Sequence, residues 1–406
     1  MSATPRLGEV AKFVRGITFK PADVVPAETP GAVPCMRTKN VQSEIDLSDV
    51  WAVDSRFVKR AEQYLEVGDI LVSSANSWNL VGKCCWVPES VKGATFGGFI
   101  AVLRPDPKVI HPRYLYRWFS SPRTQETVRS FGRQTTNISN LDFARCLGMK
   151  LSLPGIAEQQ RITQVMDHVD AQRAKRRQAL ALLEGLTQSV FRETFGSAQD
   201  GGAGYPVKSL AEWVDDERPI TYGILKPGGH QPDGVPYVRV VDMKSGGIDV
   251  SAVRRTTPEV SREYKRSLLR TGDILMSIRG HVGRLALVPD SLDGANITQD
   301  SARISVPVES SRYVMEFLRS DSSQNWMARR TKGAAVKGIN LGDIKMLEIP
   351  APEIELQRQF SMQADKIDQL VALQKNHLSK LDELFASIEH RAFSGEPWLE
   401  VPMPAA

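Results

Sequence analysis

Two similar stretches of the chain indicate how it folds. Residues 64–74 read YLEVGDILVSS, and residues 268–278, 204 positions later, read LLRTGDILMSI. In each stretch a Gly-Asp dipeptide, typical of a turn, precedes alternating apolar residues, which predict a strand. We expect a structural role for the Gly-Asp pair. Direct function is expected only in the polar loops at the end of each strand, where binding residues tend to lie.

The similarity continues on both sides of these strands. VPCMRTKNVQSEIDLSDV, from residue 33, matches VPYVRVVDMKSGGIDVSAV, from residue 235, and LVGKCCWVPE matches HVGRLALVPD. An amphipathic segment follows in each copy and leads to a long predicted helix. A repeat of this extent predicts two similar domains. The expected parts are a first domain at 1–155, a helix at 156–196, a linker at 197–206, a second domain at 207–352, a helix at 353–394 and a tail at 395–406.

Both long helices carry a heptad seam, with positions alternately three and four residues apart. The first seam comprises Ile162, Val165, Val169, Gln172, Arg176, Leu183, Leu186 and Val190. The second comprises Phe360, Ile367, Leu370, Gln374, His377, Leu381, Leu384 and Ile388. Each seam is polar near its middle, so the polar layers of paired helices would face each other in either direction. A whole domain separates the helices in sequence, which favours an antiparallel coiled coil with pseudo-twofold symmetry. We assign the polar layer to register and not to catalysis.

Further apolar residues lie off these seams, and a two-helix coiled coil cannot bury all of them. Some are expected to pack on the globular domains, and the others suggest a docking surface for helices of another protein. The set comprises Met166, Leu180, Leu182, Phe191, Val371, Leu373, Leu378 and Phe385.

Composition narrows the class of protein. The chain has 406 residues, a formal net charge of +5 and four cysteines without a C-x-x-C pair, so we expect reduced thiols and no zinc site. No stretch is apolar enough for a signal peptide or a membrane span, which favours the cytoplasm. We find no phosphate-binding loop, dinucleotide fingerprint, zinc-protease motif or hydrolase serine motif. The expectation is a non-enzymatic binding protein.

The predicted loops are rich in side chains that can contact DNA. Arg and Lys pair with guanine edges, Asn and Gln pair with adenine, and Ser and Thr bind phosphate. The candidates in the first copy are Thr18, Lys20, Arg37, Lys39, Asn40, Ser74, Asn76, Ser77, Trp78, Asn79, Arg133, Gln134, Thr135, Thr136 and Asn137. Those in the second copy are Tyr222, Lys226, Arg239, Asp242, Lys244, Arg279, His281, Arg284, Lys332 and Lys337. For any single residue a solvated loop side chain is the more common case, so the prediction depends on the clusters.

The order of these parts resembles the specificity subunit of a type I restriction–modification system. The resemblance covers nearly the whole chain and depends on GRQTTNISNLDF leading to LSLPGIAEQQRI, and on its partner KGINLGDIKMLEIPAPEIELQRQF. The second copy departs from the pattern at Leu356, which stands where the first has Glu158. The resemblance implies an α+β fold with two similar α/β target-recognition domains, each followed by a long helix.

The resemblance also implies the function. Each domain would read one half of a bipartite, asymmetric target in double-stranded DNA. The helix pair would set the spacer and dock two methyltransferase subunits, and two restriction subunits can join. The chain itself would be non-catalytic and hold no cofactor, because S-adenosylmethionine, ATP and magnesium would belong to the partner subunits. A helix from Glu158 to Phe195 would be about 57 Å long, which is compatible with half-sites about one DNA turn apart.

Two alternatives remain open from the sequence. The duplicated domains could form a protein-binding scaffold without DNA recognition, or the chain could be a nuclease or methyltransferase with an unrecognised motif. The basic cluster Arg173, Lys175, Arg176 and Arg177 could contact spacer phosphates or be ordinary helix surface.

Overall fold

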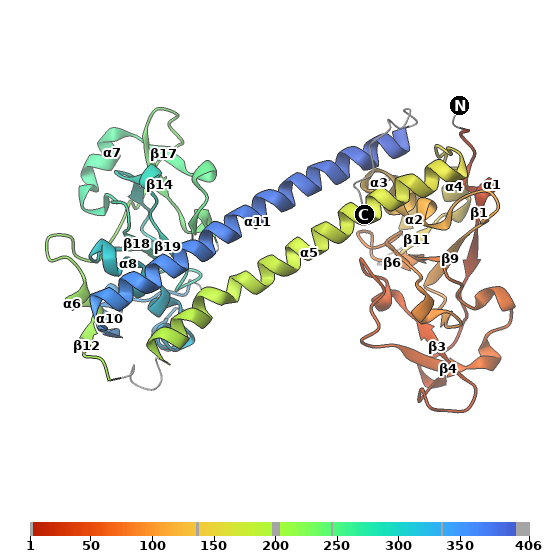
Figure 1. Cartoon of the computed structure of the whole chain (residues 1–406), viewed down its shortest axis with the longest axis horizontal. Coiled ribbons are helices and arrows are strands. Elements are labelled where there is room, and N and C mark those ends of the chain that lie inside the picture. Colours follow the sequence, from red (N-terminus) through yellow and green to blue (C-terminus); the bar gives the residue numbers. More distant parts are fainter. Residues whose placement is uncertain (1–2, 135–137, 197–203, 245–246, 334–335, 395–406) are drawn as a thin grey trace. The chain divides into compact units, whose positions relative to one another are not determined.

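The computed structural model describes residues 3–134, 138–196, 204–244, 247–333 and 336–394 (Figure 1). The chain divides into two compact units. Unit 1 comprises residues 1–176 and 377–406, and unit 2 comprises residues 177–376. Both boundaries fall inside long helices, α5 (Ile156–Phe195) and α11 (Ile354–Ser394). Each unit therefore combines one globular domain with half of each long helix.

Unit 1 is built on an antiparallel sheet in the order β1-β9-β5-β7. The unit also contains a second four-stranded sheet, β2-β4-β3-β8, and a three-stranded sheet, β10-β11-β6. The strands are β1 (Ala11–Arg15), β2 (Val24–Val25), β3 (Ala32–Met36), β4 (Trp51–Asp54), β5 (Ile70–Ser73), β6 (Ala75–Asn76), β7 (Cys84–Trp86), β8 (Thr95–Phe96), β9 (Ile100–Pro105), β10 (Gly132–Gln134) and β11 (Ser139–Leu141). The shorter helices are α1 (Leu7–Val10), α2 (Pro112–Ser120), α3 (Pro122–Ser130) and α4 (Phe143–Leu147).

Unit 2 repeats the central sheet in the order β13-β21-β18-β19. Its smaller sheets are β17-β14-β20, β15-β16 and β12-β22. The strands are β12 (Val207–Ser209), β13 (Thr221–Tyr222), β14 (Val235–Val238), β15 (Met243–Lys244), β16 (Gly247–Ile248), β17 (Arg254–Thr256), β18 (Ile274–Ser277), β19 (Leu285–Leu287), β20 (Asn296–Ile297), β21 (Ser301–Ile304) and β22 (Glu348–Pro350). The shorter helices are α6 (Leu210–Trp213), α7 (Pro258–Glu263), α8 (Val308–Arg319), α9 (Asp321–Arg330) and α10 (Leu341–Lys345).

Strand register confirms that the two domains share one plan. Ile70 in β5 is paired with Leu103 of β9, and Ile274 in β18 is paired with Ile304 of β21. A close backbone approach recurs as well: a Cβ on Gly16 would lie 2.3 Å from the carbonyl oxygen of Gly97. A Cβ on the corresponding Gly223 would lie 1.9 Å from that of Ile297. Only glycine fits either position.

The Gly-Asp pairs at the start of β5 and β18 have a structural role. Asp69 accepts a 2.9 Å hydrogen bond from the backbone N–H of Glu66 and forms a 2.7 Å ion pair with Arg104. Asp273 accepts a 2.7 Å hydrogen bond from the backbone N–H of Arg270 and forms a 2.7 Å ion pair with Arg218. Both carboxylates are buried, so each stabilises its turn by charge-assisted hydrogen bonds.

Contacts inside each unit give the direction of helix pairing. In unit 1, Met166 near the start of α5 shares a core with Ala392 at the end of α11, and Arg173 Nε lies 2.6 Å from Asp382 Oδ1. In unit 2, Phe191 at the end of α5 contacts Phe360 at the start of α11, with ring centroids 5.3 Å apart. Opposite helix ends meet, so the predicted antiparallel pairing is confirmed.

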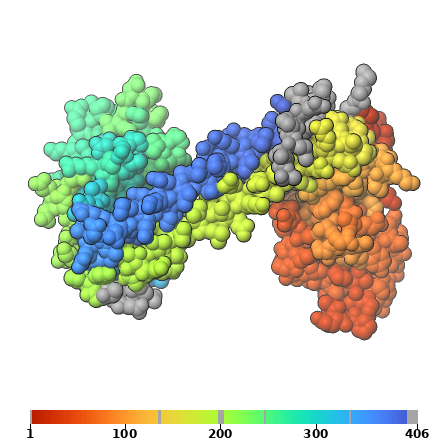
Figure 2. All heavy atoms as spheres, in the orientation of Figure 1, coloured from red at the N-terminus to blue at the C-terminus, as the bar shows by residue number. Residues whose placement is uncertain are grey.

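Both long helices reach the surface of the molecule (Figure 2), and some of their apolar residues are exposed. Among the off-seam residues, Met166 and Phe191 are buried, as expected for residues that pack on the domains. Leu182 and Leu373 are exposed, at 72% and 48% of their surface. Within the described ranges, no helix combines the length and apolarity that crossing a bilayer requires.

Candidate nucleic-acid interface

Two loops that are far apart in sequence meet at the end of the central strand in each unit. In unit 1, β11 is paired with β6, so Ser139 lies opposite Asn76, and β10 joins them from the other side. In unit 2, Arg279 and Lys332 each form a bridge with Gly338. The two polar clusters predicted in each domain are therefore brought together in the same way in both copies.

A third segment, which the sequence analysis did not identify, joins these loops. The carbonyl oxygen of Phe99 accepts hydrogen bonds from the N–H groups of Ser74 (2.9 Å) and Ala75 (3.2 Å). In unit 2 the carbonyl of Asp300 accepts from Ile278 (2.8 Å) and Arg279 (3.3 Å). These residues directly precede β9 and β21. The signal available in the sequence was divergence between the copies, since Gly-Phe in one aligns with Gln-Asp in the other.

In unit 1 the third segment borders a cavity of about 490 Å³, which is lined by Phe99 together with Thr18, Lys39 and Trp51. The guanidinium of Arg37 lies 3.8 Å from the centre of the Trp51 ring and forms a 3.0 Å ion pair with Asp49. Lys39 lies 2.8 Å from the same carboxylate. Hydrogen bonds from Lys39 and Arg37 lower the pKa of Asp49. Phe99 is 63% exposed. The cavity therefore presents an aromatic ring to solvent as well as Arg37 and Lys39, which are paired with Asp49.

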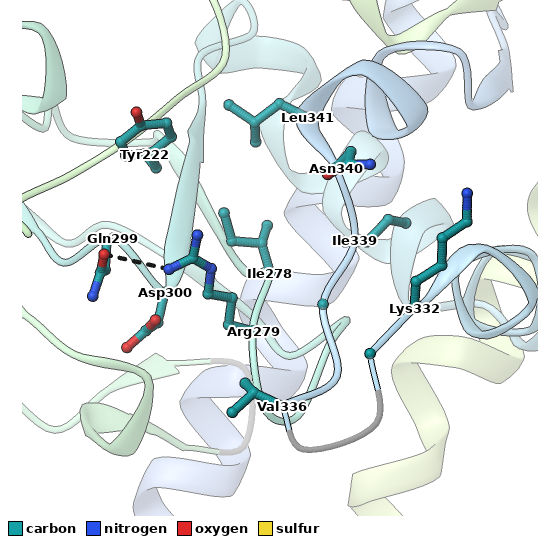
Figure 3. A pocket seen from close by; sticks show the side chains of 12 residues that line it. Tyr222, Ile278, Arg279, Gln299, Asp300, Lys332, Val336, Ile339, Asn340 and Leu341 are labelled. Atoms are coloured by element: carbon teal, nitrogen blue, oxygen red, sulfur yellow. Dashed lines mark hydrogen bonds between the residues drawn. The ribbon is translucent and has the colours of Figure 1, made fainter.

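The loops of unit 2 border a cavity of about 700 Å³, the recognition pocket of unit 2 (Figure 3). Tyr222 lies at one side, and Lys332 extends from the opposite side. Between them Arg279 Nη1 donates a 3.3 Å hydrogen bond to Gln299 Oε1. The pocket thus offers cationic, amide, carboxylate and aromatic groups, the types that read base edges.

Several predicted DNA contacts have partners inside their own domain. Asn40 and Asp242 are buried and accept bonds from the N–H groups of Arg37 and Arg239, at 2.7 and 2.9 Å. Arg239 also forms a 2.6 Å ion pair with Asp242. Arg284 donates to the carbonyl of Val240 at 3.0 Å. These side chains shape the loops, and contact with DNA remains a prediction for them.

The other candidates differ in exposure. Ser74 is buried, Asn76 is half-buried, Lys244 forms a 2.8 Å ion pair with Asp249, and Arg133 forms a 2.5 Å ion pair with Asp142. The exposed candidates are Thr18, Lys20, Lys39, Ser77, Trp78, Asn79, Tyr222, Lys226, Arg279, His281, Lys332 and Lys337. Thr135, Thr136, Asn137 and the side chain of Gln134 lie outside the described residues.

The predicted seam residues of α5 and α11 also differ in exposure. The buried ones are Ile162, Val169, Phe360, Ile367 and Ile388, and the half-buried ones are Val165, Gln172, Arg176, Leu183, Val190, Gln374, His377 and Leu381. Leu186, Leu370 and Leu384 are between 39% and 47% exposed. In the basic cluster, Arg173 is mostly buried and forms ion pairs with Asp170 and Asp382. No group of three or more His, Cys, Asp or Glu residues in the described ranges could hold a metal ion.

The chain is similar in sequence to DNA specificity subunits of type I restriction enzymes. A family model for the type I restriction modification DNA specificity domain matches residues 3–184 and 224–383. The EcoKI specificity subunit of Escherichia coli K12 is 24% identical over 420 residues, which cover 95% of this chain and 87% of that protein. The EcoBI specificity subunit of Escherichia coli is 29% identical over 279 residues, which cover 61% of this chain and 58% of that protein.

Solved structures share the fold. The crystal structure of a type I restriction–modification S subunit from M. genitalium superposes with a TM-score of 0.61 at 14% identity, over 98% of this chain and 97% of that chain. A chain from a structure describing assembly of a type I system superposes with a TM-score of 0.57 at 18% identity, over 96% and 97%. The family model covers most of the chain. The chain therefore belongs to the family of type I restriction–modification DNA specificity subunits, the non-catalytic part of these enzymes.

Proposed function

We propose that each globular domain of this chain reads one half of a bipartite, asymmetric DNA target. One observation supports this above all. Three segments meet at the same place in both units, on the same scaffold, but their side chains differ. Phe99 and Asp300 occupy equivalent turns, and Ala75 and Arg279 occupy equivalent strand ends. Two copies that keep the scaffold and vary these positions suit two readers of different sequences.

The helix pair has a separate role in this proposal. We assign spacer length to α5 and α11, since each is a continuous helix of 40 or 41 residues that contributes to both units. We assign methyltransferase docking to the apolar residues that the pair leaves exposed, such as Leu182, Met362 and Leu373. S-adenosylmethionine, and the ATP and magnesium of a restriction subunit, would then be bound by the partners.

Methylation mapping tests the proposal directly. The chain is co-expressed with the methyltransferase subunit in a host without other adenine methylation, and modified adenines are mapped across the genome. The expected result is one asymmetric motif in two parts around a fixed, unspecified spacer. Adenine methylation at a continuous motif would contradict the proposal that each domain reads a separate half of the target.

A mobility-shift assay distinguishes the protein-binding scaffold. The purified complex should shift a duplex that carries the mapped motif at lower concentration than a scrambled duplex. Equal shifts for both would favour the scaffold. Incubation of the chain alone with DNA, S-adenosylmethionine, ATP and magnesium should give neither methylation nor cleavage.

A further inference from the structure

Unit 2 contains a second large cavity, of about 740 Å³, that the recognition loops do not border. We call it the basic pocket. Its basic side chains are Arg218, Lys265, Arg266, Arg270, Arg303 and Lys345, and its carboxylates are Glu217 and Asp293. Arg218 is paired with Asp273. Lys265, Arg266, Arg270 and Lys345 are exposed, and within the described part of the chain none of the four forms an ion pair.

Arg303 is the buried element of this pocket. Its side chain comes from the central strand β21, and the residue is only 3% exposed. Nη1 and Nη2 donate to the carbonyl oxygens of Leu268 (3.2 Å) and Pro219 (2.9 Å), while Nε has no hydrogen-bond partner among the described residues. Burial, together with the nearby cations Arg218 and Arg270, lowers the pKa of Arg303. An anion in the pocket would stabilise this buried guanidinium through its charge, because Arg218 and Arg270 are like-charged neighbours.

The basic pocket is not part of the repeated plan. Strand pairing aligns Arg303 with Val102, because Leu275 pairs with Arg303 where Leu71 pairs with Val102. Arg270 and Glu66 are also equivalent, because the backbone N–H of each donates to the aspartate of its Gly-Asp turn, Asp273 or Asp69. Unit 1 therefore has an apolar residue and a carboxylate where unit 2 has two arginines. Such a difference is not needed to build the shared fold, which points to binding.

Its position relates it to the recognition pocket of unit 2. Adjacent residues of β13 line the two cavities, Thr221 the basic pocket and Tyr222 the recognition pocket. The short helix α10 contributes Lys345 to the first and Leu341 to the second. Four helical residues span about 6 Å. Neighbouring side chains of a strand point to opposite faces, so the two cavities lie on either side of β13, which is the edge strand of its sheet. The backbone of a duplex held at the recognition pocket can reach the basic pocket around this edge.

We propose that the basic pocket binds a phosphate group of the DNA backbone beside the half-site read by unit 2, with Arg266 and Arg270 as its main ligands and the buried charge of Arg303 beneath them. This inference rests on the proposed function. It adds an asymmetry: unit 2 holds the backbone at a site that unit 1 lacks. Planar guanidinium groups suit phosphate oxygens, and each neutralised phosphate releases counterions and steepens the salt dependence of binding.

The test compares the complex carrying Arg266→Ala with Arg270→Ala against the wild-type complex on the mapped duplex. Both side chains are exposed, so the fold should be retained. The slope of log affinity against log salt should become shallower by about 1 to 2, and affinity near 150 mM salt should fall roughly tenfold. The methylated sequence should stay the same. The matched control, Lys208→Ala with Arg262→Ala, removes two charges of unit 2 outside the pocket and should keep the wild-type slope.

An unchanged slope in the Arg266/Arg270 variant, with wild-type binding still specific for the motif, would overturn this inference and leave the proposed function intact. Inorganic phosphate provides a further arm. If phosphate raises the melting temperature of the wild-type complex but not of the variant, while both bind DNA equally, the pocket takes a free phosphate and the DNA assignment is wrong. Loss of motif-specific binding by the wild-type complex would instead count against the proposed function.

Discussion

Arg117 and Glu316 occupy equivalent positions in the two units and carry opposite charges. Their helices are anchored alike: the hydroxyl of Tyr114 in α2 donates to a backbone carbonyl at 2.9 Å, and that of Tyr313 in α8 does so at 2.8 Å. Arg117 forms ion pairs with Asp167 and Asp170 of α5, at 2.5 and 3.0 Å. Glu316 instead accepts a 2.6 Å bond from Gln188 Nε2, near the other end of α5. At this position each globular domain therefore carries the side chain that bonds to the part of α5 it contacts.

Replacement of Arg117 with methionine should destabilise unit 1. The side chain keeps its volume, but Asp167 and Asp170 lose their common cation at a position only 9% exposed. Because both carboxylates are partly solvated, we expect a loss of roughly 2–3 kcal/mol, less than for a fully buried pair. Hydrogen exchange read by mass spectrometry reports the opening of unit 1 separately from unit 2. Arg123→Met, at an exposed site on α3, is the control, and equal protection in the two variants would refute the prediction.

Phe360→Ala should loosen the helix pair in unit 2. Phe360 is 1% exposed and contacts Phe191 and Phe195, so its truncation leaves a cavity between α5 and α11. A loss of about 3–5 kcal/mol is typical of such a change. Met362→Ala, two residues away and 57% exposed, should cost much less. Denaturant unfolding followed in unit 2 measures both, and similar losses would show that the aromatic cluster is not the main contact.

Glu389→Gln should stabilise unit 1 at neutral pH. Burial raises the pKa of Glu389 above its ordinary value of 4.5, although Arg117 and Arg173 oppose the shift. The folded state then binds the proton more readily than the unfolded state, so stability falls as pH rises from about 4.5 through the raised pKa. The glutamine removes that loss. The variant should exceed wild type at pH 7 to 8 and approach it below pH 4.5, and Glu383→Gln, at an exposed position, should not. A variant less stable at pH 8 would mean that attraction to the arginines outweighs burial.

Arg279→Ala should relax recognition of one base position in one half-site. Arg279 lies in the recognition pocket of unit 2, with its guanidinium held by Gln299. Loss of a base contact of this kind costs about 1–3 kcal/mol of discrimination. Genome-wide methylation mapping should show a degenerate position in the half read by unit 2 and an unchanged half from unit 1. Arg262→Ala, on α7 and outside the recognition pocket, should leave the motif intact. Relaxation in both halves would argue against independent readers.

Matched insertions in the two helices should lengthen the DNA spacer without altering either half-sequence. Seven residues added after Lys175 in α5 and seven after Ser379 in α11 keep the heptad register. Each insertion adds about 10 Å, the length of roughly three base pairs. Methylation mapping gives the spacer directly. A new base sequence with the old spacer would show that the helices do not set the distance.

The sequence by itself determined the duplication, the strands after the Gly-Asp turns, the two long helices and the family. These features are local or periodic, so spacing along the chain is enough to reveal them. The direction of helix pairing needed tertiary contacts, because the polar layers of the two seams would face each other in either arrangement. Burial also separated Met166 from Leu182, which look alike as off-seam residues.

Tertiary structure alone decided how the sites are assembled. The turns that contain Phe99 and Asp300 join the recognition loops through backbone hydrogen bonds, which side-chain type does not reveal. The basic pocket combines β13, β21, the segment before β18 and α10, and strand pairing places Arg303 of β21 beside residues more than 30 positions away. Asn40 and Arg239 remain predicted DNA contacts, and the fold adds that both shape their loops, a role that side-chain type alone does not reveal. Only the folded chain shows which polar groups already have partners.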